Sequence, residues 1–283
     1  MLKVAAIQMQ MSLDKRANVL KAKEMLSRAA KAGAKIILLP ELFEGLYFCK
    51  DMDPAYFSWA KERVEHPLLK EFSALAKKLN VVVLLSYFEK DHEKYFNSLV
   101  AIDADGKVLD NYRKTHIPDG PGYEEKFYFT PGDTGFKVYD TQYAKIGAGI
   151  CWDQWFPETA RSLALMGAEL IFFPTAIGSE PEIGLDSKEH WQRVQMGHAA
   201  ANMVPVIAAN RIGEEEGKTC SLNFYGSSFM TDHIGAKMSE ASRDTEEIIY
   251  GEYDLQANAK LREYWALFKD RRPESYTSLL DQH

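Results

Sequence analysis

The stretch KIGAGICWDQWFPE, residues 145–158, combines an apolar segment, a cysteine at its end and a segment that can begin a helix. Gly147 and Gly149 alternate along the apolar segment, which is typical of a strand that other parts of the chain approach closely. Pro157 suits the first turn of the next helix. We therefore predict a strand, a turn and a helix. Cys151 would lie at the turn, at the carboxyl edge of a sheet, where open α/β sheets bind ligands.

Further short apolar runs lie on both sides of this stretch, with amphipathic segments between them. Their Val and Ile content and their flanking Pro, Gly or Asn predict buried strands at residues 4–9, 35–40, 81–86, 169–174 and 204–210. One helix is predicted between the first two strands, with Asp14 as its N-cap, and another from Pro67 to Asn80. The pair Asp105-Gly106 predicts a hairpin. The pattern indicates a layered α/β fold with mixed β-sheets and no dividing linker.

The composition is that of an ordinary globular protein. Hydrophobic residues make up 46% and charged residues 27% of the 283 positions, which excludes a disordered or fibrous chain. The formal charge of -7 argues against nucleic acid as a partner. The first residues lack the pattern of a secretory signal, and the least charged stretch, 194–210, would be a poor membrane span. Three widely spaced cysteines favour a reducing compartment, so we expect a cytoplasmic protein without a membrane partner.

Cys151 has a sequence context that the other two cysteines lack. Cys49 and Cys220 lie outside any strand-turn-helix pattern and are interpreted as bystanders. The chain contains no C-x-x-C or H-E-x-x-H pattern and neither glycine-rich phosphate motif, so we expect no metal and no cofactor. A free cysteine is most often inert packing. A catalytic thiol additionally needs a base and a group that stabilises an oxyanion.

Glu41 and Lys114 supply these two groups at the ends of other predicted strands. Glu41 directly follows the apolar run 35–40, where partial desolvation suits a general base. Lys114 ends the run 107–114, where its ammonium suits a developing negative charge and lowers the pKa of the Cys151 thiol. Each charged residue alone is most often a solvated surface group. The hypothesis therefore depends on the combination.

Three separated motifs resemble, in the same chain order, the Glu, Lys and Cys motifs of the nitrilase superfamily of carbon–nitrogen hydrolases. They are PELFE (40–44), YRKTHIP (112–118) and GICWDQWFPE (149–158), and the resemblance covers nearly the whole chain. It implies a four-layer αββα sandwich with mixed β-sheets. It also implies a single domain over residues 1–283, with a C-terminal tail from about residue 255 that is used in subunit packing. The resemblance further implies a homo-oligomer, a dimer or larger.

The resemblance assigns roles to four residues. Cys151 would be the nucleophile, Glu41 the general base and Lys114 the oxyanion stabiliser. Glu125 matches an additional glutamate that helps to position the substrate and the catalytic groups. Spacing alone does not choose between Glu124 and Glu125.

Longer stretches resemble the branch of the superfamily that acts on N-carbamoylputrescine, among them residues 114–138 and FPTAIGSEP (173–181). The implied substrate is a small ureido-amine, hydrolysed to putrescine, carbon dioxide and ammonia. The implied pocket is lined by Tyr47, Trp152 and Glu180. The Glu180 carboxylate would meet the ammonium of the substrate, and aromatic faces would contact its aliphatic linker. A loop carboxylate is, however, most often merely exposed.

Two alternatives stay open. One is another amidase of the superfamily, such as a β-ureidopropionase, an ω-amidase or a nitrilase. Substrates that end in a carboxylate would require Arg or Lys where Glu180 stands. The other is a catalytically silent binding or scaffold protein, which would have no reason to keep Glu41, Lys114 and Cys151 together.

Overall fold

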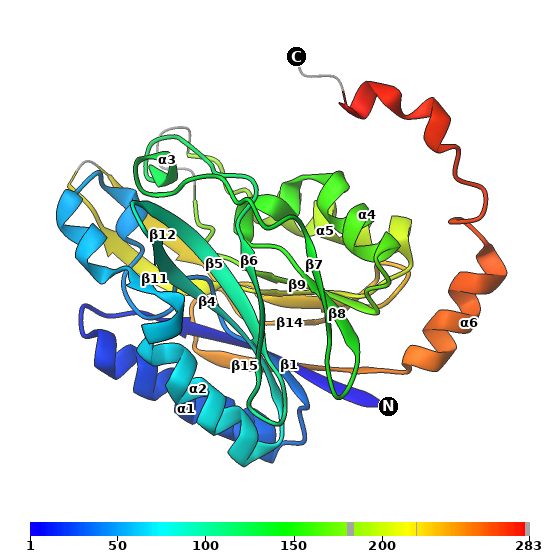
Figure 1. The fold of residues 1–283 in the computed structure, drawn as a ribbon, viewed down its shortest axis with the longest axis horizontal. Helices are drawn as coiled ribbons and strands as arrows, with labels where there is room; N and C mark the ends of the chain where they lie inside the picture. Colours follow the sequence, from blue (N-terminus) through cyan, green and yellow to red (C-terminus); the bar gives the residue numbers. More distant parts are fainter. Residues whose placement is uncertain (180–183, 219, 281–283) are drawn as a thin grey trace.

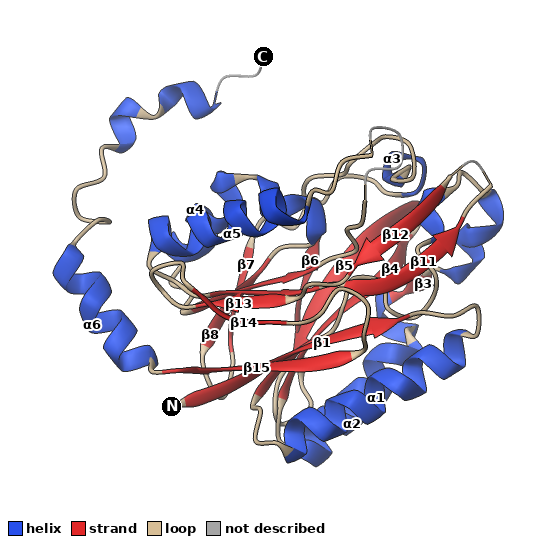
Figure 2. Ribbon diagram, turned by 180° about the vertical axis from the view of Figure 1, so that it is seen from behind, coloured by secondary structure: helices blue, strands red, loops and turns tan. Residues whose placement is uncertain are grey.

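Two mixed β-sheets pack face to face, and helices cover the outer face of each sheet (Figure 1). The computed structural model describes residues 1–179, 184–218 and 220–280. Helices α1 (Lys15–Lys31) and α2 (Pro67–Leu79) lie outside the first sheet, and α4 (Pro157–Leu165) and α5 (Lys188–Asn202) lie outside the second (Figure 2). The predicted αββα sandwich with mixed β-sheets is confirmed.

The first sheet has the strand order β12-β11-β1-β2-β4-β5-β6, with β15 beside β1 and β3 beside β4. Strands β1, β2 and β4 run parallel, whereas β5 and β6 continue the sheet antiparallel. Its strands are β1 (Leu2–Gln10), β2 (Ile36–Leu38), β3 (Lys61–Glu62), β4 (Val82–Asp91), β5 (Lys94–Ile102), β6 (Val108–Arg113), β11 (Arg211–Glu216), β12 (Ser221–Tyr225) and β15 (Glu247–Tyr253).

The second sheet has the order β14-β13-β10-β9-β8-β7. Its three central strands are parallel, and an antiparallel strand flanks them on each side. The strands are β7 (Lys137–Asp140), β8 (Lys145–Ala148), β9 (Leu170–Pro174), β10 (Val206–Ala209), β13 (Phe229–Thr231) and β14 (Lys237–Glu240). Both sheets therefore mix parallel and antiparallel strands, and the hairpin predicted at Asp105-Gly106 joins β5 and β6 of the first sheet.

Alternating side chains along each strand serve two different cores. In β1, Val4 and Ala6 face the second sheet, whereas Ala5 and Ile7 face α1 and α2. In β9, Phe172 lies in the core between the sheets, and its neighbours pack under α4 and α5. Because successive side chains of a strand point to opposite faces, a strand that is covered on both faces has to be apolar throughout.

Local signals at the helix ends are confirmed. The Asp14 side chain accepts a hydrogen bond from the Ala17 N–H, which caps α1. Helix α2 begins at Pro67, and Asn80 adopts the left-handed conformation that ends it. The predicted strand at 35–40 is shorter than expected, since regular pairing covers only Ile36–Leu38. Beyond Leu38, the Leu39 N–H still donates to the carbonyl oxygen of Leu84 in β4, and Glu41 follows two residues later.

Two other segments lie outside the layers. Helix α3 (Glu125–Tyr128) forms one turn near the carboxyl ends of the strands. Helix α6 (Leu255–Trp265) and the chain after it project from the sandwich (Figure 1, orange to red). Among the helices of the described residues, none combines the length and the apolar character that a membrane span requires.

Candidate active site

Three strand ends bring the predicted catalytic side chains together. Glu41 lies three residues after β2, Lys114 follows β6 directly, and Cys151 lies three residues after β8. Each of the three residues is buried. The first two strands belong to one sheet and β8 to the other, so the site lies where the two sheets meet at their carboxyl edge.

Lys114 lies at the centre of a buried charge cluster. Its Nζ lies 3.0 Å from Oε1 of Glu41, and 2.9 and 2.7 Å from the two carboxylate oxygens of Glu125. The side chains of all three residues are 0% exposed. Glu124 is the N-cap of α3, and it is Glu125 that turns inward toward the ammonium. The structure thereby distinguishes two glutamates that spacing left equivalent.

The two carboxylate oxygens of Glu41 have different surroundings. Oε1 accepts hydrogen bonds from Lys114 and from Nδ2 of Asn97, the latter at 2.7 Å. Asn97 is oriented in turn by the hydroxyl of Ser86, 3.3 Å from its Oδ1. Oε2 of Glu41 is buried, and no group of the described residues donates a hydrogen bond to it. This oxygen is an acceptor held in place without a partner.

Cys151 opens a 3₁₀ helix, Cys151–Trp155, with a strained backbone. Its φ of 42° lies in the left-handed region, which is unfavourable for a residue with a Cβ. Its Sγ contacts the carbonyl oxygen of Ala176 at 3.8 Å. Strain of this kind persists only when the surrounding structure imposes it, and it is common in active sites.

Lys114 lowers the pKa of the Cys151 thiol, as predicted, but the net shift of that pKa is upward. Burial raises this pKa well above its usual range, and the nearby Glu41 carboxylate raises it further. Lys114 does lower it, but the other two effects are larger. The thiol is therefore protonated at rest, because a buried thiolate beside two carboxylates is poorly solvated.

Asp153 anchors the 3₁₀ helix that carries Cys151. Its Oδ2 accepts hydrogen bonds from the Ile150 N–H at 2.8 Å and from the Tyr112 hydroxyl at 2.7 Å. Its Oδ1 accepts the His116 N–H at 3.0 Å. These bonds hold the turn on both sides of the thiol. Asp153 was not among the predicted site residues, although its place in the motif with Cys151 was a signal for it.

The residues predicted to line the substrate pocket have different positions. Trp152 is 39% exposed beside Cys151, and its ring packs against Trp155. The first backbone hydrogen bond of the 3₁₀ helix runs from the Asp153 N–H to the Ile150 carbonyl. The N–H of Trp152 lies one residue before this first donor. Glu180 lies outside the described residues.

Tyr47 is part of the charge cluster itself. It is wholly buried, and its hydroxyl donates to Oε1 of Glu125 at 2.6 Å. Burial and the charge of Glu125 raise the pKa of Tyr47, so the hydroxyl keeps its proton and acts as a donor. Its observed contact is therefore with a member of the cluster.

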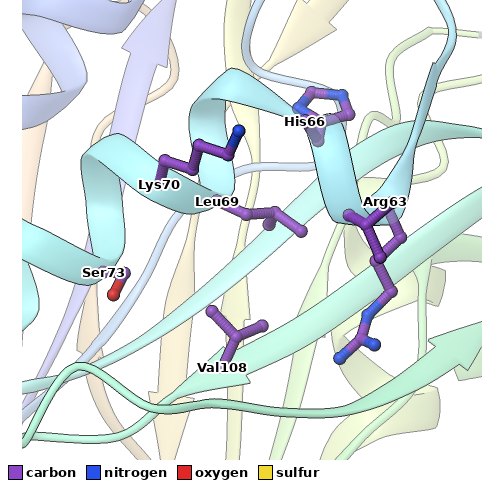
Figure 3. A pocket seen from close by; sticks show the side chains of 7 residues that line it. Arg63, His66, Leu69, Lys70, Ser73 and Val108 are labelled. Carbon is purple, nitrogen blue, oxygen red and sulfur yellow. The ribbon is translucent and has the colours of Figure 1, made fainter.

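A second pocket lies apart from the charge cluster. Among the described residues, no group of three or more His, Cys, Asp or Glu side chains is placed to hold a metal ion. A pocket of about 310 Å³ lies at the start of α2, where Arg63, His66 and Lys70 surround it together with apolar side chains (Figure 3). No member of the charge cluster lines this pocket.

Comparisons with known proteins place the chain among carbon–nitrogen hydrolases. The family model described as carbon-nitrogen hydrolase matches residues 3–263. The chain is 51% identical over 283 residues to a citrullinase of Francisella tularensis, and the match covers 100% of this chain and 99% of that protein. It is 49% identical over 282 residues to an N-carbamoylputrescine amidase of Arabidopsis thaliana, and the match covers 98% of this chain and 94% of that protein. The crystal structure of a carbon-nitrogen hydrolase from Helicobacter pylori superposes with a TM-score of 0.92 at 37% identity, and the match covers 100% of this chain and 99% of that one.

Proposed function

The chain belongs to the carbon–nitrogen hydrolase family, and we propose that it hydrolyses the ureido group of N-carbamoylputrescine. The products are putrescine, carbon dioxide and ammonia. The observation that carries the proposal is the buried cluster of Glu41, Lys114 and Glu125 beside Cys151. It supplies a base, a cation and a nucleophile in one place, which are the parts that thiol-dependent acyl transfer requires.

In the first half-reaction, Oε2 of Glu41 takes the thiol proton while Sγ of Cys151 attacks the carbamoyl carbon. The ammonium of Lys114 and the backbone N–H of Trp152 stabilise the oxyanion. Glu41 then returns its proton to the terminal nitrogen, which leaves as ammonia, and a carbamoyl-thioester remains on Cys151. The raised pKa of the thiol makes base assistance necessary, because little thiolate exists beforehand.

In the second half-reaction, Glu41 takes a proton from a water molecule that attacks the thioester carbon. The C–S bond breaks, the thiol regains its proton, and the released carbamate decays to the amine and carbon dioxide. Glu125 and Tyr47 keep Lys114 and the substrate aligned through both steps. Loss of one oxyanion donor is expected to cost about a hundredfold or more in rate.

The substrate is the finer part of the proposal. N-carbamoylputrescine is supported by full-length relatives of about half identity that carry that name. Citrulline is a second candidate, because the 51% identical relative is named a citrullinase. Both molecules present a terminal ureido group on a short chain with an amine, and citrulline adds a carboxylate. We propose that the Glu180 carboxylate binds the amine of the substrate. This role rests on the sequence alone, because Glu180 lies outside the described residues.

Ammonia release by the purified protein tests this function. N-carbamoylputrescine, citrulline and N-carbamoyl-β-alanine are compared by kcat/KM, with Cys151→Ala as the inactive variant and Cys220→Ser as its matched control. We expect the first substrate to be preferred by at least tenfold, and only Cys151→Ala to abolish turnover. Preference for citrulline would overturn the substrate but keep the mechanism. Full turnover by Cys151→Ala would overturn the mechanism.

We also propose that the single domain over residues 1–283 assembles into a homo-oligomer through its C-terminal tail. Large apolar side chains of α6 and the tail are exposed, with Tyr264 at 85% and Leu280 at 84%. Together with α4 and α5 the tail surrounds a cavity of about 780 Å³. Exposed large apolar side chains gathered in one segment are typical of a protein interface. A cytoplasmic location is supported by three cysteines without disulfides.

A further inference from the structure

A buried ion pair lies beside the loop that carries Glu41. Arg211, the first residue of β11, places its Nη1 2.8 Å from Oε1 of Glu215, and the two side chains are 0% and 2% exposed. The guanidinium also lies over the rings of Tyr47 and Phe224. A buried pair of this kind is poor evidence for stability by itself, because desolvation offsets much of its attraction. Its remaining hydrogen bonds indicate another role.

The guanidinium of Arg211 binds the backbone of the loop 41–47. Its Nη2 donates to the carbonyl oxygen of Glu41 at 2.7 Å and to that of Leu42 at 3.2 Å. Its Nη1 donates to the carbonyl oxygen of Gly45 at 3.3 Å. Leu42 has a φ of 47°, an unfavourable value for its side chain. The planar fork of one arginine thus holds a strained turn that begins at the proposed base.

Glu215 binds the other end of the same loop. Its Oε2 accepts the Tyr47 N–H at 2.5 Å, and the Tyr47 hydroxyl donates to Glu125 at 2.6 Å. The ion pair therefore contacts the loop at two residues that are linked to the charge cluster. Arg211 binds the backbone carbonyl of Glu41. Glu215 binds the backbone N–H of Tyr47, whose hydroxyl orients the carboxylate of Glu125.

We propose that the Arg211–Glu215 pair positions the general base, by holding the loop 41–47 so that Oε2 of Glu41 faces the Cys151 thiol. This inference rests on the proposed function of Glu41 and Cys151. Arg211 is a positioning residue, since its contacts are with the backbone of the loop. Lysine cannot replace it, because a single ammonium lacks the planar fork that reaches Glu215 and two loop carbonyls together.

The substitution Arg211→Lys separates positioning from stability. It keeps a cation opposite Glu215 but removes the fork to the Glu41 and Leu42 carbonyls. A double variant, Arg211→Met with Glu215→Gln, removes the pair without leaving a lone buried charge. Leu26→Ala in α1 is the control, because it weakens the core that α1 and α2 form with the first sheet and removes none of the hydrogen bonds from Arg211 or Glu215 to the loop backbone.

Two readouts follow the position of the base. The first is alkylation of the Cys151 thiol by iodoacetamide from pH 6 to pH 10, measured on the peptide containing Cys151 by mass spectrometry. The second is kcat and KM on the best ureido substrate. Thermal unfolding is recorded for each variant, so that a loss of folded protein is recognised.

For both Arg211 variants we expect alkylation at pH 7 to slow by at least tenfold and its profile to move to higher pH. The value of kcat falls by a similar factor, with KM changed less than twofold. Leu26→Ala lowers the unfolding temperature and leaves both readouts as in the wild type. A wild-type alkylation profile in Arg211→Lys overturns the inference. So does a loss that matches its unfolded fraction.

The alkylation experiment also separates this inference from the proposed substrate. Iodoacetamide needs only the thiol and its base, so the test decides even if no ureido compound is turned over. Glu41→Gln is measured alongside and is expected to slow alkylation at pH 7 by at least tenfold, because the amide cannot take the thiol proton. A wild-type alkylation rate at pH 7 for Glu41→Gln would refute Glu41 as the base and the positioning role together.

Discussion

The ammonium of Lys114 donates to Oε1 of Glu41 across 3.0 Å, and neither side chain is exposed to solvent. With Glu125 on its other side, the cluster carries one negative charge when both carboxylates are ionised. Burial lowers the pKa of Lys114, but Glu125 and Glu41 outweigh it and raise that pKa well above its usual range. Burial also raises the pKa of Glu125. Lys114 therefore stays a cation, and any proton that the cluster gains goes to a carboxylate.

Glu41→Gln tests the base. The amide can keep a bond from Lys114 through its oxygen, but it cannot accept the thiol proton. We expect kcat to fall by roughly 10² to 10⁴, the usual contribution of general base catalysis, with the fold unchanged. Glu44→Gln is the matched control, since Glu44 follows Glu41 by three residues and its side chain forms an ion pair with Lys15 of α1. Steady-state kinetics measure the activity, and circular dichroism checks the fold. Equal activity of Glu41→Gln and Glu44→Gln would refute Glu41 as the general base.

Lys114→Met tests the cation. Its removal leaves two buried carboxylates facing each other, so we expect the free energy of unfolding at pH 7 to fall by about 3–5 kcal/mol. Urea denaturation measures the loss, and Lys126→Met, on an exposed lysine, should cost about 0.5 kcal/mol or less. Adding Glu125→Gln should recover part of the stability but no activity. Without that recovery, the proposed charge repulsion is incorrect.

Tyr47→Phe tests the link from the loop to Glu125. Loss of the hydroxyl removes the 2.6 Å hydrogen bond to a buried carboxylate, which should cost about 1.5–3 kcal/mol of stability. We expect kcat to fall about tenfold. Tyr128→Phe is the control, since the Tyr128 hydroxyl donates to the backbone carbonyl of Asp51 rather than to a carboxylate of the cluster. Equal kinetic losses in the two variants would argue for a purely structural role.

The buried His66 side chain is expected to make the free energy of unfolding depend on pH in mild acid. Burial lowers its pKa to about 4, and Lys15 and Lys61 add to this effect while Glu89 opposes it. Unfolded His66 has a pKa near 6.5, so the unfolded state takes up a proton first as the pH falls. Stability is therefore lost from about pH 6.5 toward pH 4. Between pH 7 and pH 5 the loss from this residue is about 2 kcal/mol.

His66→Phe removes this titration and keeps the ring beside Tyr87. Urea unfolding at pH 7 and pH 5 should show a smaller loss for the variant than for the wild type. His92→Asn is the control, because His92 is 95% exposed and its left-handed backbone suits asparagine. An identical loss in His66→Phe and the wild type would show that other groups govern acid sensitivity.

Light scattering tests the role of the tail in assembly. We expect the wild type to have at least twice the mass of one chain, and Leu280→Lys combined with Trp265→Lys to shift it toward the monomer. Both residues are exposed and apolar, so the substitutions cost little in an isolated chain. Leu13→Lys, which changes an exposed leucine before α1, is expected to leave the mass unchanged. A wild-type monomer would contradict the proposal.

Local patterns in the sequence determined the layers of this protein and the residues that carry its proposed chemistry. Asp14, Pro67 and Asn80 act on backbone groups within one turn of themselves, so a short window contains the whole signal. Glu41, Lys114 and Cys151 stood out because each is a polar residue at the end of an apolar strand. The resemblance of their motifs to one family then joined them into one site.

Only the tertiary structure decided how those residues are held. Asn97 meets Glu41 across 56 positions of sequence, and Arg211 meets the Glu41 carbonyl across 170. No local pattern can contain both partners of such a contact. The choice of Glu125 over Glu124 and the raised pKa of the Cys151 thiol depend likewise on which groups the fold buries together. Hydrophobic patterning acts locally, whereas hydrogen bonding and desolvation in a core depend on which distant segments the fold brings into contact.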